Sequence, residues 1–149
     1  MKRVLLGLLA YAQFALLVLA FLPILRVVSL VHRGDPVQRV PGRWIRRLGR
    51  AISAWSPLWR FSIDGEAPPD VSDRAYVVVS NHQSNADPML LAKLPWDMRW
   101  VAKAELSRWP VLGWVFLWGG DIFFRRGHRR AVEQMMAACR QTLLAGSRS

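Results

Sequence analysis

Cysteine and acidic residues are both scarce in this sequence of 149 residues. Cys139 is the single cysteine, so the chain cannot form an internal disulfide, and a cysteine-rich zinc site is excluded. Only 10 residues are Asp or Glu, against 21 Lys or Arg, which gives a formal net charge of +11. Hydrophobic residues make up 52% of the chain, too many for an intrinsically disordered protein. The length predicts one domain, and the sequence contains no internal repeat.

The excess of positive charge favours an anionic partner: a nucleic acid, an acidic lipid surface or a phosphorylated substrate. The sequence also contains 8 tryptophans, and indole rings are enriched at the headgroup level of membranes. A basic protein that is this apolar suits a membrane surface better than a nucleic acid. We therefore expect membrane lipids, and no nucleic acid, among its partners.

The N-terminal region contains an uncharged stretch from Val4 to Leu25. As a helix this stretch would measure roughly 33 Å, about the thickness of the hydrocarbon core of a bilayer. A cleaved signal peptide and a buried soluble helix fit it less well than a membrane-embedded helix. The sequence leaves open whether the helix crosses the bilayer or enters one leaflet and returns. The many arginines that follow predict that the rest of the chain lies on the cytoplasmic face of the inner or plasma membrane.

A second, amphipathic helix is predicted from about Gly42 to Trp59, after the breakers Pro36 and Pro41. One stripe of it carries Trp44, Leu48, Ile52, Trp55 and Trp59, and the remaining surface carries Arg43, Arg46, Arg47 and Arg50. The stripe either packs on a protein core or lies on an anionic membrane surface, and the enrichment in Trp and Arg favours the membrane. Residues 1–59 are therefore expected to form a membrane-associated helical region.

The remainder of the chain, residues 60–149, alternates between predicted strands and predicted helices. The strands are expected at 60–65, 76–80, 98–102 and 121–125, and the helices at 87–94, 110–118 and 129–144. Such alternation is typical of the α/β class. The expected fold is an N-terminal membrane helix or helical hairpin followed by a partial, mostly parallel α/β layer.

The segment with the most chemical potential is Asn81–Asp87, between the predicted strand 76–80 and a predicted helix. In open α/β sheets, ligands bind at this carboxyl edge of the strands. His82 and Asp87 can meet across such a turn, so that the carboxylate fixes the imidazole tautomer and the second ring nitrogen acts as a base. The alternatives are a surface histidine without function and an aspartate that only caps the following helix. No metal site is expected.

The segment Asn81–Asp87 resembles the first block of the glycerolipid acyltransferases, the 1-acylglycerol-3-phosphate (lysophosphatidate) acyltransferases, whose signature is Asn-His-x4-Asp. The segment Lys103–Leu106, followed by Pro110 and Gly113-Trp114, resembles the Lys-x-Glu-Leu segment of that family and the helix after it. Residues 120–126, Gly-Asp-Ile-Phe-Phe-Arg-Arg, resemble the second block, Gly-x-Ile-Phe-x-x-Arg. The resemblance covers roughly residues 60–145.

The resemblance implies a mechanism and a set of site residues. His82 would be the general base that deprotonates the acceptor hydroxyl, and Asp87 would orient it. The hydroxyl would attack the thioester of acyl-CoA or acyl-carrier protein, a co-substrate, so no cofactor is expected. Arg126 would pair with the phosphate of a lysophospholipid, Lys103 would add to that phosphate site, and Gly120 would belong to the same substrate-binding block. The most fitting product is phosphatidate, made from 1-acylglycerol-3-phosphate.

The sequence departs from the family pattern at its C-terminal end. A third block, Phe-Pro-Glu-Gly-Thr-Arg, and a fourth apolar block with a proline do not follow the helix predicted at 129–144. Residues 60–149 are therefore expected to be the N-terminal part of an acyltransferase domain. The alternative to an active enzyme is a non-catalytic, membrane-associated fragment or degenerate copy of one.

Overall fold

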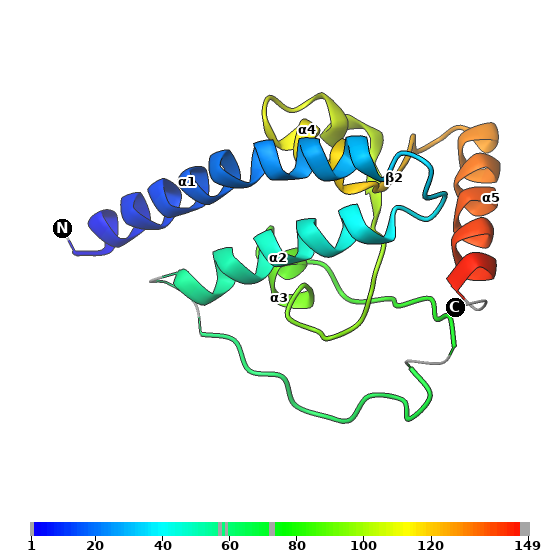
Figure 1. Cartoon of the computed structure of the whole chain (residues 1–149). Coiled ribbons are helices and arrows are strands. Elements are labelled where there is room, and N and C mark those ends of the chain that lie inside the picture. Colours follow the sequence, from blue (N-terminus) through cyan, green and yellow to red (C-terminus); the bar gives the residue numbers. More distant parts are fainter. Residues whose placement is uncertain (1, 57, 59, 72–73, 147–149) are drawn as a thin grey trace.

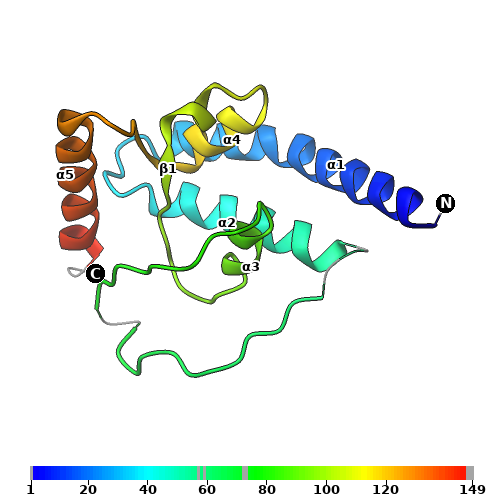
Figure 2. The same ribbon diagram turned by 180° about the vertical axis from the view of Figure 1, so that it is seen from behind.

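The computed structural model describes residues 2–56, 58, 60–71 and 74–146. In chain order the elements are α1 (Lys2–Val31), α2 (Arg39–Trp55), α3 (Asp87–Leu91), β1 (Val101–Lys103), the 3-10 helix η1 (Ala104–Arg108), α4 (Leu112–Gly119), β2 (Ile122–Phe124) and α5 (Arg129–Gly146). The helices α1 and α2 lie side by side, α4 packs on both, and α3 packs on α2 (Figure 1). The view from behind shows α5 at the opposite end of the molecule from the N-terminus, where it packs on β2 (Figure 2).

The first helix, α1, is the expected apolar helix, and at 30 residues it is long and apolar enough to cross a membrane. Much of its surface is bare: the side chains of Leu8 and Leu16 are 62% and 68% exposed. Towards its C-terminal end α1 instead contributes to the hydrophobic core, which consists of Leu17, Val18, Leu25, Ile45, Leu48, Ile52 and Val115. The core thus joins α1, α2 and α4, and much of the N-terminal half of α1 lies outside it.

The second helix begins earlier than the prolines predicted. We expected α2 to begin after Pro41-Gly42, but it begins at Arg39 and ends at Trp55. Asp35 explains the start, because its carboxylate accepts the backbone N–H of Arg39 at 2.7 Å and places a negative charge at the helix N-terminus. Pro41 lies in the first turn, where the missing N–H is no loss. Trp59 lies outside the described residues.

The apolar stripe of α2 faces protein for much of its length. Leu48 and Ile52 are buried in the core, Trp44 is half-buried, and Trp55 is 70% exposed. Packing on a protein core therefore describes the middle of the stripe, whereas the exposed Trp55 remains free for a membrane surface. Gln13 of α1 donates a hydrogen bond to the carbonyl of Ile52 at 3.1 Å and ties the two helices together.

The sheet is parallel, as expected, but it has two strands in the described part of the chain. β1 pairs with β2 in the register Val101↔Ile122 and Lys103↔Phe124. The α/β class is confirmed in this partial form, with η1 and α4 as the helical connection between the strands. The two strands correspond to the segments predicted at 98–102 and 121–125. The helices predicted at 87–94, 110–118 and 129–144 correspond to α3, α4 and α5.

The strands predicted at 60–65 and 76–80 are wrong for this structure. Both segments are irregular, and the side chains of Val77 and Val79 are 72% and 88% exposed. A strand needs a hydrogen-bonded neighbour, and a β-branched apolar run expresses its preference only on a half-buried pleated surface. No strand among the described residues pairs with 76–80, so the apolar run that precedes His82 stays unpaired.

Candidate active site

The turn before α3 brings His82 and Asp87 together, as their spacing predicted. The Nδ1 atom of His82 lies 3.0 Å from Oδ2 of Asp87. An ionised carboxylate can only accept, so Nδ1 is the donor in this contact, and in the neutral form of the ring Nε2 then carries a lone pair. The imidazole is 63% exposed and the Asp87 side chain 26% exposed. The described part of the chain offers Nε2 no hydrogen-bond partner, so this nitrogen faces solvent.

The backbone of the same turn holds Asp87 in place. The N–H groups of Gln83 and Ser84 both donate to Oδ2 of Asp87 at 2.8 Å. These backbone hydrogen bonds, with a smaller contribution from His82, lower the pKa of Asp87 below its ordinary value and keep it ionised. The carboxylate bonds the turn that precedes α3 and does not cap the helix, whose N-cap residue is Ala86. The capping role that the sequence left open for Asp87 is therefore wrong.

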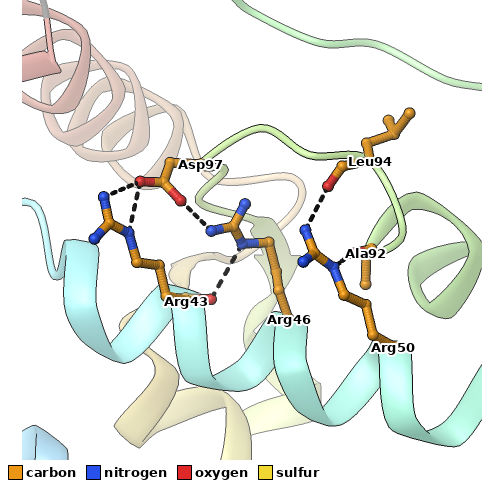
Figure 3. Close-up of polar contacts among 7 residues, drawn as sticks. Arg43, Arg46, Arg50, Ala92, Leu94 and Asp97 are labelled. Atoms are coloured by element: carbon orange, nitrogen blue, oxygen red, sulfur yellow. Dashed lines mark hydrogen bonds and ion pairs between the residues drawn. The ribbon is translucent and has the colours of Figure 1, made fainter. Parts of the chain in front are cut away.

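The helix α2 positions this turn through α3. Ala92, at the end of α3, lies so close to Gly49 of α2 that a Cβ at residue 49 would meet the Ala92 Cβ at 2.8 Å. Arg50 donates to the carbonyls of Ala92 and Leu94 at 2.6 and 2.8 Å (Figure 3). The hydroxyl of Ser53, which lies 2.8 Å from the carbonyl of Gly49 in its own helix, also lies 3.2 Å from the carbonyl of Met89. Because α3 starts at Asp87, these contacts fix the His82–Asp87 turn on the N-terminal helical pair.

The two cations predicted to bind substrate lie at one edge of the sheet. Lys103 ends β1 and pairs in register with Phe124 of β2, and Arg126 follows two residues after Phe124. The carboxyl ends of parallel strands meet at one edge, so Lys103 and Arg126 come to the same end of the molecule. Both side chains are exposed. No hydrogen bond or ion pair within the described residues links either cation to the His82–Asp87 pair.

Gly120 has a conformational role that is visible in the backbone. It ends α4 with φ 80°, in the left-handed region that favours glycine. A Cβ at this position would collide with the side chain of Gln38. Its carbonyl accepts a hydrogen bond from Nε of Arg99 at 2.5 Å. Gly120, the glycine of the second block, therefore sets the backbone conformation between α4 and β2. Substrate binding by Gly120 stays a prediction.

Sequence reasoning missed the contributions of α2 and of the turn backbone to the site. The signal for the turn was present, because the short side chain of an Asp can hydrogen-bond backbone groups three or four residues before it. The contacts of Gly49, Arg50 and Ser53 with α3 had no signal, since they join residues far apart in the chain. No group of three or more His, Cys, Asp or Glu side chains in the described residues is placed to hold a metal ion.

Comparison with known proteins identifies the family to which this arrangement belongs. The acyltransferase family model matches residues 61–148, more than half of the chain and the part that holds His82, Asp87, Lys103 and Arg126. The chain belongs to the acyltransferase family. No solved structure matches it. The blocks read from the sequence at 81–87 and 120–126 both lie inside the matched region, so the resemblance to this family is confirmed.

Three relatives illustrate the range of substrates in the family. A lyso-ornithine lipid O-acyltransferase of Pseudomonas aeruginosa is 33% identical over 102 residues, 67% of this chain and 36% of that protein. The chloroplastic 1-acyl-sn-glycerol-3-phosphate acyltransferase of Arabidopsis thaliana is 28% identical over 129 residues, 85% of this chain and 36% of that protein. A 1-acyl-sn-glycerol-3-phosphate acyltransferase of Chlamydomonas reinhardtii is 25% identical over 135 residues, 91% of this chain and 40% of that protein. The chain spans 33–48% of the length of the relatives it matches.

Proposed function

We propose that this acyltransferase-family chain transfers an acyl group from a thioester to the free hydroxyl of a lysophospholipid, and that His82 is the base. The acceptor we propose is 1-acylglycerol-3-phosphate, with phosphatidate as the product. The observation that carries the proposal is the His82–Asp87 pair at 3.0 Å inside the matched region. The acyl donor is acyl-CoA or acyl-carrier protein, and the reaction takes place at the cytoplasmic face of the membrane.

The proposed chemistry follows from the tautomer of His82. Nε2 takes the proton of the acceptor hydroxyl as the oxygen attacks the thioester carbonyl carbon. The C–S bond of the resulting tetrahedral intermediate breaks, and the thiolate takes the proton back from the imidazolium. Asp87, whose pKa is lowered, stays ionised and stabilises the imidazolium that forms between the two steps. The reaction needs no acyl-enzyme and no redox cofactor.

The cations at the edge of the sheet support a phosphate-bearing acceptor. The guanidinium of Arg126 is planar and suits bidentate pairing with a phosphate, and the ammonium of Lys103 adds a point charge. We expect Arg126→Ala to raise the Michaelis constant for 1-acylglycerol-3-phosphate more than it lowers the turnover number. An effect confined to the acyl donor would assign Arg126 to the other substrate. Parallel assays with a lyso-ornithine lipid would show whether the preference depends on phosphate.

The base assignment is tested by substitution of His82 in the purified chain in detergent. Thioester consumption is measured with lysophosphatidate and either acyl-CoA or acyl-carrier protein. We expect His82→Ala to lower the turnover number by about 10²–10⁴-fold, the usual contribution of a general base, and Asp87→Asn to impair it nearly as much. His32→Ala is the matched control, since His32 directly follows the N-terminal helix and lies outside the proposed site. Turnover within a few-fold of the unmutated chain in His82→Ala would falsify the assignment.

A second candidate function is a membrane-associated chain without catalysis. The observation that favours it is the exposed, unpaired run at 76–80, because a catalytic histidine must be held rigidly and this run leads directly to His82. The same assay separates the two functions. The absence of any His82-dependent turnover in chains that bind membranes and remain folded would favour this second function.

A further inference from the structure

A surface cavity of about 150 Å³ lies between α2 and the loop that follows α3. Arg43, Arg46 and Arg50 point from successive turns of α2 toward this loop (Figure 3), and Arg47, Pro95 and Asp97 complete the lining. Asp97 is the one acidic residue in the lining that the structure describes. The lining therefore contains four arginines and one carboxylate, and the cavity carries an excess of positive charge. None of these residues belongs to the proposed catalytic or acceptor site.

The carboxylate of Asp97 satisfies the arginines only in part. Nε and Nη2 of Arg43 lie 2.7 and 2.6 Å from Oδ2 of Asp97, and Nη2 of Arg46 pairs with Oδ1. Nε of Arg46 also donates, at 3.4 Å, to the carbonyl of Gly42. The side chain of Arg46 is only 5% exposed, and its Nη1 is buried with no hydrogen-bond partner in the described residues. A buried donor on a charged group that lacks an acceptor is costly.

The two other arginines are held in place without using the cavity. Arg50 directs Nε and Nη2 to the carbonyls of Ala92 and Leu94, which fixes its guanidinium beside the loop. Arg47 lies over the ring of Trp44, with its Cζ 4.5 Å from the ring centroid, and it is exposed. Arg47 and Arg50 are thus held in place before any ligand arrives, which lowers the entropic cost of binding an anion.

We infer that this cavity binds a phosphate group, carried by a phospholipid headgroup or by a soluble phosphate compound. Guanidinium forks match phosphate oxygens in geometry and charge. Because Nη1 of Arg46 is buried, a phosphate oxygen reaches it only when the loop at 95–97 shifts and Asp97 releases Arg46. Asp97 is therefore the internal carboxylate with which the phosphate competes. Burial raises the pKa of Asp97, but its hydrogen bonds and ion pairs with Arg43 and Arg46 outweigh burial and lower it, so this competitor stays ionised.

Because phosphate and Asp97 compete for the arginines, removal of Asp97 and removal of an arginine should change phosphate binding in opposite directions. Binding of inorganic phosphate to the full chain in detergent is measured by calorimetry, and binding to vesicles of phosphatidylcholine with and without phosphatidate by flotation. All variants carry Arg126→Gln, which removes the phosphate contact proposed for the acceptor site, so the outcome does not depend on the proposed function. The variants are Asp97→Asn, which removes the competitor, and Arg47→Gln, which removes an exposed cation. Arg140→Gln, an exposed arginine of α5, is the matched control.

We expect Asp97→Asn to strengthen phosphate binding about tenfold and Arg47→Gln to weaken it by a similar factor, while Arg140→Gln changes nothing. If the effects are confined to vesicles with phosphatidate, the phosphate belongs to a lipid headgroup; if inorganic phosphate alone shows them, it belongs to a soluble compound. Circular dichroism checks that each variant is folded. The side chain of Arg47 is exposed, so Arg47→Gln tests the cavity without disturbing the core. The inference is overturned if Arg47→Gln binds phosphate as tightly as the chain that carries Arg126→Gln alone, or if Arg140→Gln weakens binding equally. Weaker binding by folded Asp97→Asn would also overturn it.

Discussion

Asp121, which precedes β2, has the most clearly shifted pKa among the described residues. The residue keeps part of its surface exposed, but its carboxyl is enclosed by protein. Burial raises the pKa of Asp121 to about 7, against the opposing effects of the Trp100 backbone and Arg99. Arg99 itself is tied to the carbonyl of Gly120 at 2.5 Å and to the hydroxyl of Thr142 at 3.0 Å. Arg99 therefore joins the start of β2 to α5.

The raised pKa of Asp121 predicts a pH dependence of stability. The folded chain holds the Asp121 proton more tightly than the unfolded chain, whose pKa is near 3.8. The stabilising contribution of the protonated carboxyl is therefore complete below about pH 4 and is lost as the pH rises through about 7. We expect Asp121→Asn, which cannot ionise, to raise the melting temperature relative to the unmutated chain at pH 8 and to leave it nearly unchanged at pH 4.

The measurement is thermal unfolding in detergent across that pH range. Asp64→Asn serves as the control, because Asp64 lies exposed in the irregular segment after α2. A difference between Asp121→Asn and the unmutated chain that is the same at pH 4 and pH 8 would exclude the linkage. The amide introduced by Asp121→Asn keeps an oxygen able to accept a backbone N–H, so the substitution isolates the charge.

At the scale of elements, the contact between α2 and α3 decides where the His82–Asp87 turn lies. α3 has only five residues, too few to be stable by itself. It is held by the close approach of Ala92, its C-cap residue, to Gly49 and by the hydrogen bond that Arg50 donates to the carbonyl of Ala92. The N-terminal helical pair, for which the sequence predicts only a membrane association, therefore also supports the candidate active site.

This contact predicts a specific packing defect. Gly49→Ala places a Cβ 2.8 Å from the Ala92 Cβ, so α3 must shift. Overpacking of this kind typically costs about 1–3 kcal/mol, against a gain of about 1 kcal/mol in helix propensity. We expect Gly49→Ala to lower the melting temperature and the rate of thioester consumption. The double variant Gly49→Ala/Ala92→Gly should recover both, because the second change removes the clashing atom.

The matched control is Gly7→Ala in α1, where a Cβ would meet nothing within 4 Å. It gains the same helix propensity without a clash, so we expect its stability to be unchanged or higher. If Gly49→Ala behaved like Gly7→Ala, the close approach of α2 and α3 would not be required.

At the scale of the whole molecule, the apolar N-terminal part of α1 is exposed, whereas the basic remainder of the chain contains the elements that pack on one another. Only 17% of the apolar stretch of the candidate membrane helix is buried, where α1 packs on α2 and α4. Arg26 lies over the ring of Trp118 at 5.3 Å, near the end of α1 where the apolar run gives way to charge. A cation on an indole suits the level of the lipid headgroups.

We expect the exposed leucines of α1 to anchor the protein in membranes. Leu8→Arg/Leu16→Arg places two charges on its bare surface, each of which costs about 2.5–3.5 kcal/mol near the centre of a membrane helix. In membrane fractions, the variant should be released by about 1 M salt, which screens headgroup attraction but not hydrocarbon burial. The unmutated chain should stay in the pellet. Val132→Arg/Met136→Arg, on the exposed face of α5, is the control, and equal release of both variants would contradict the anchor.

Much of this organisation could be predicted from local sequence. The apolar run of α1, the amphipathic period of α2 and α5, and the glycines that end α4 are local signals, and each corresponds to an observed helix. The meeting of His82 with Asp87 could also be predicted, because five residues across a turn suffice. Strands 60–65 and 76–80 could not be predicted correctly from composition, since a strand depends on a neighbour that can come from anywhere in the chain.

The sequence by itself determined the charge, the apolar N-terminal run, the approximate positions of α1 to α5 and the family, because all of these follow from residue type and short spacing. The tertiary structure alone decided that α2 holds α3 and that Val77 and Val79 are exposed. It alone placed Arg43 and Arg46 against Asp97 and buried an unpaired nitrogen of Arg46. The reason is physical: burial and pairing between residues about forty or fifty positions apart depend on how helices pack, which no local pattern encodes.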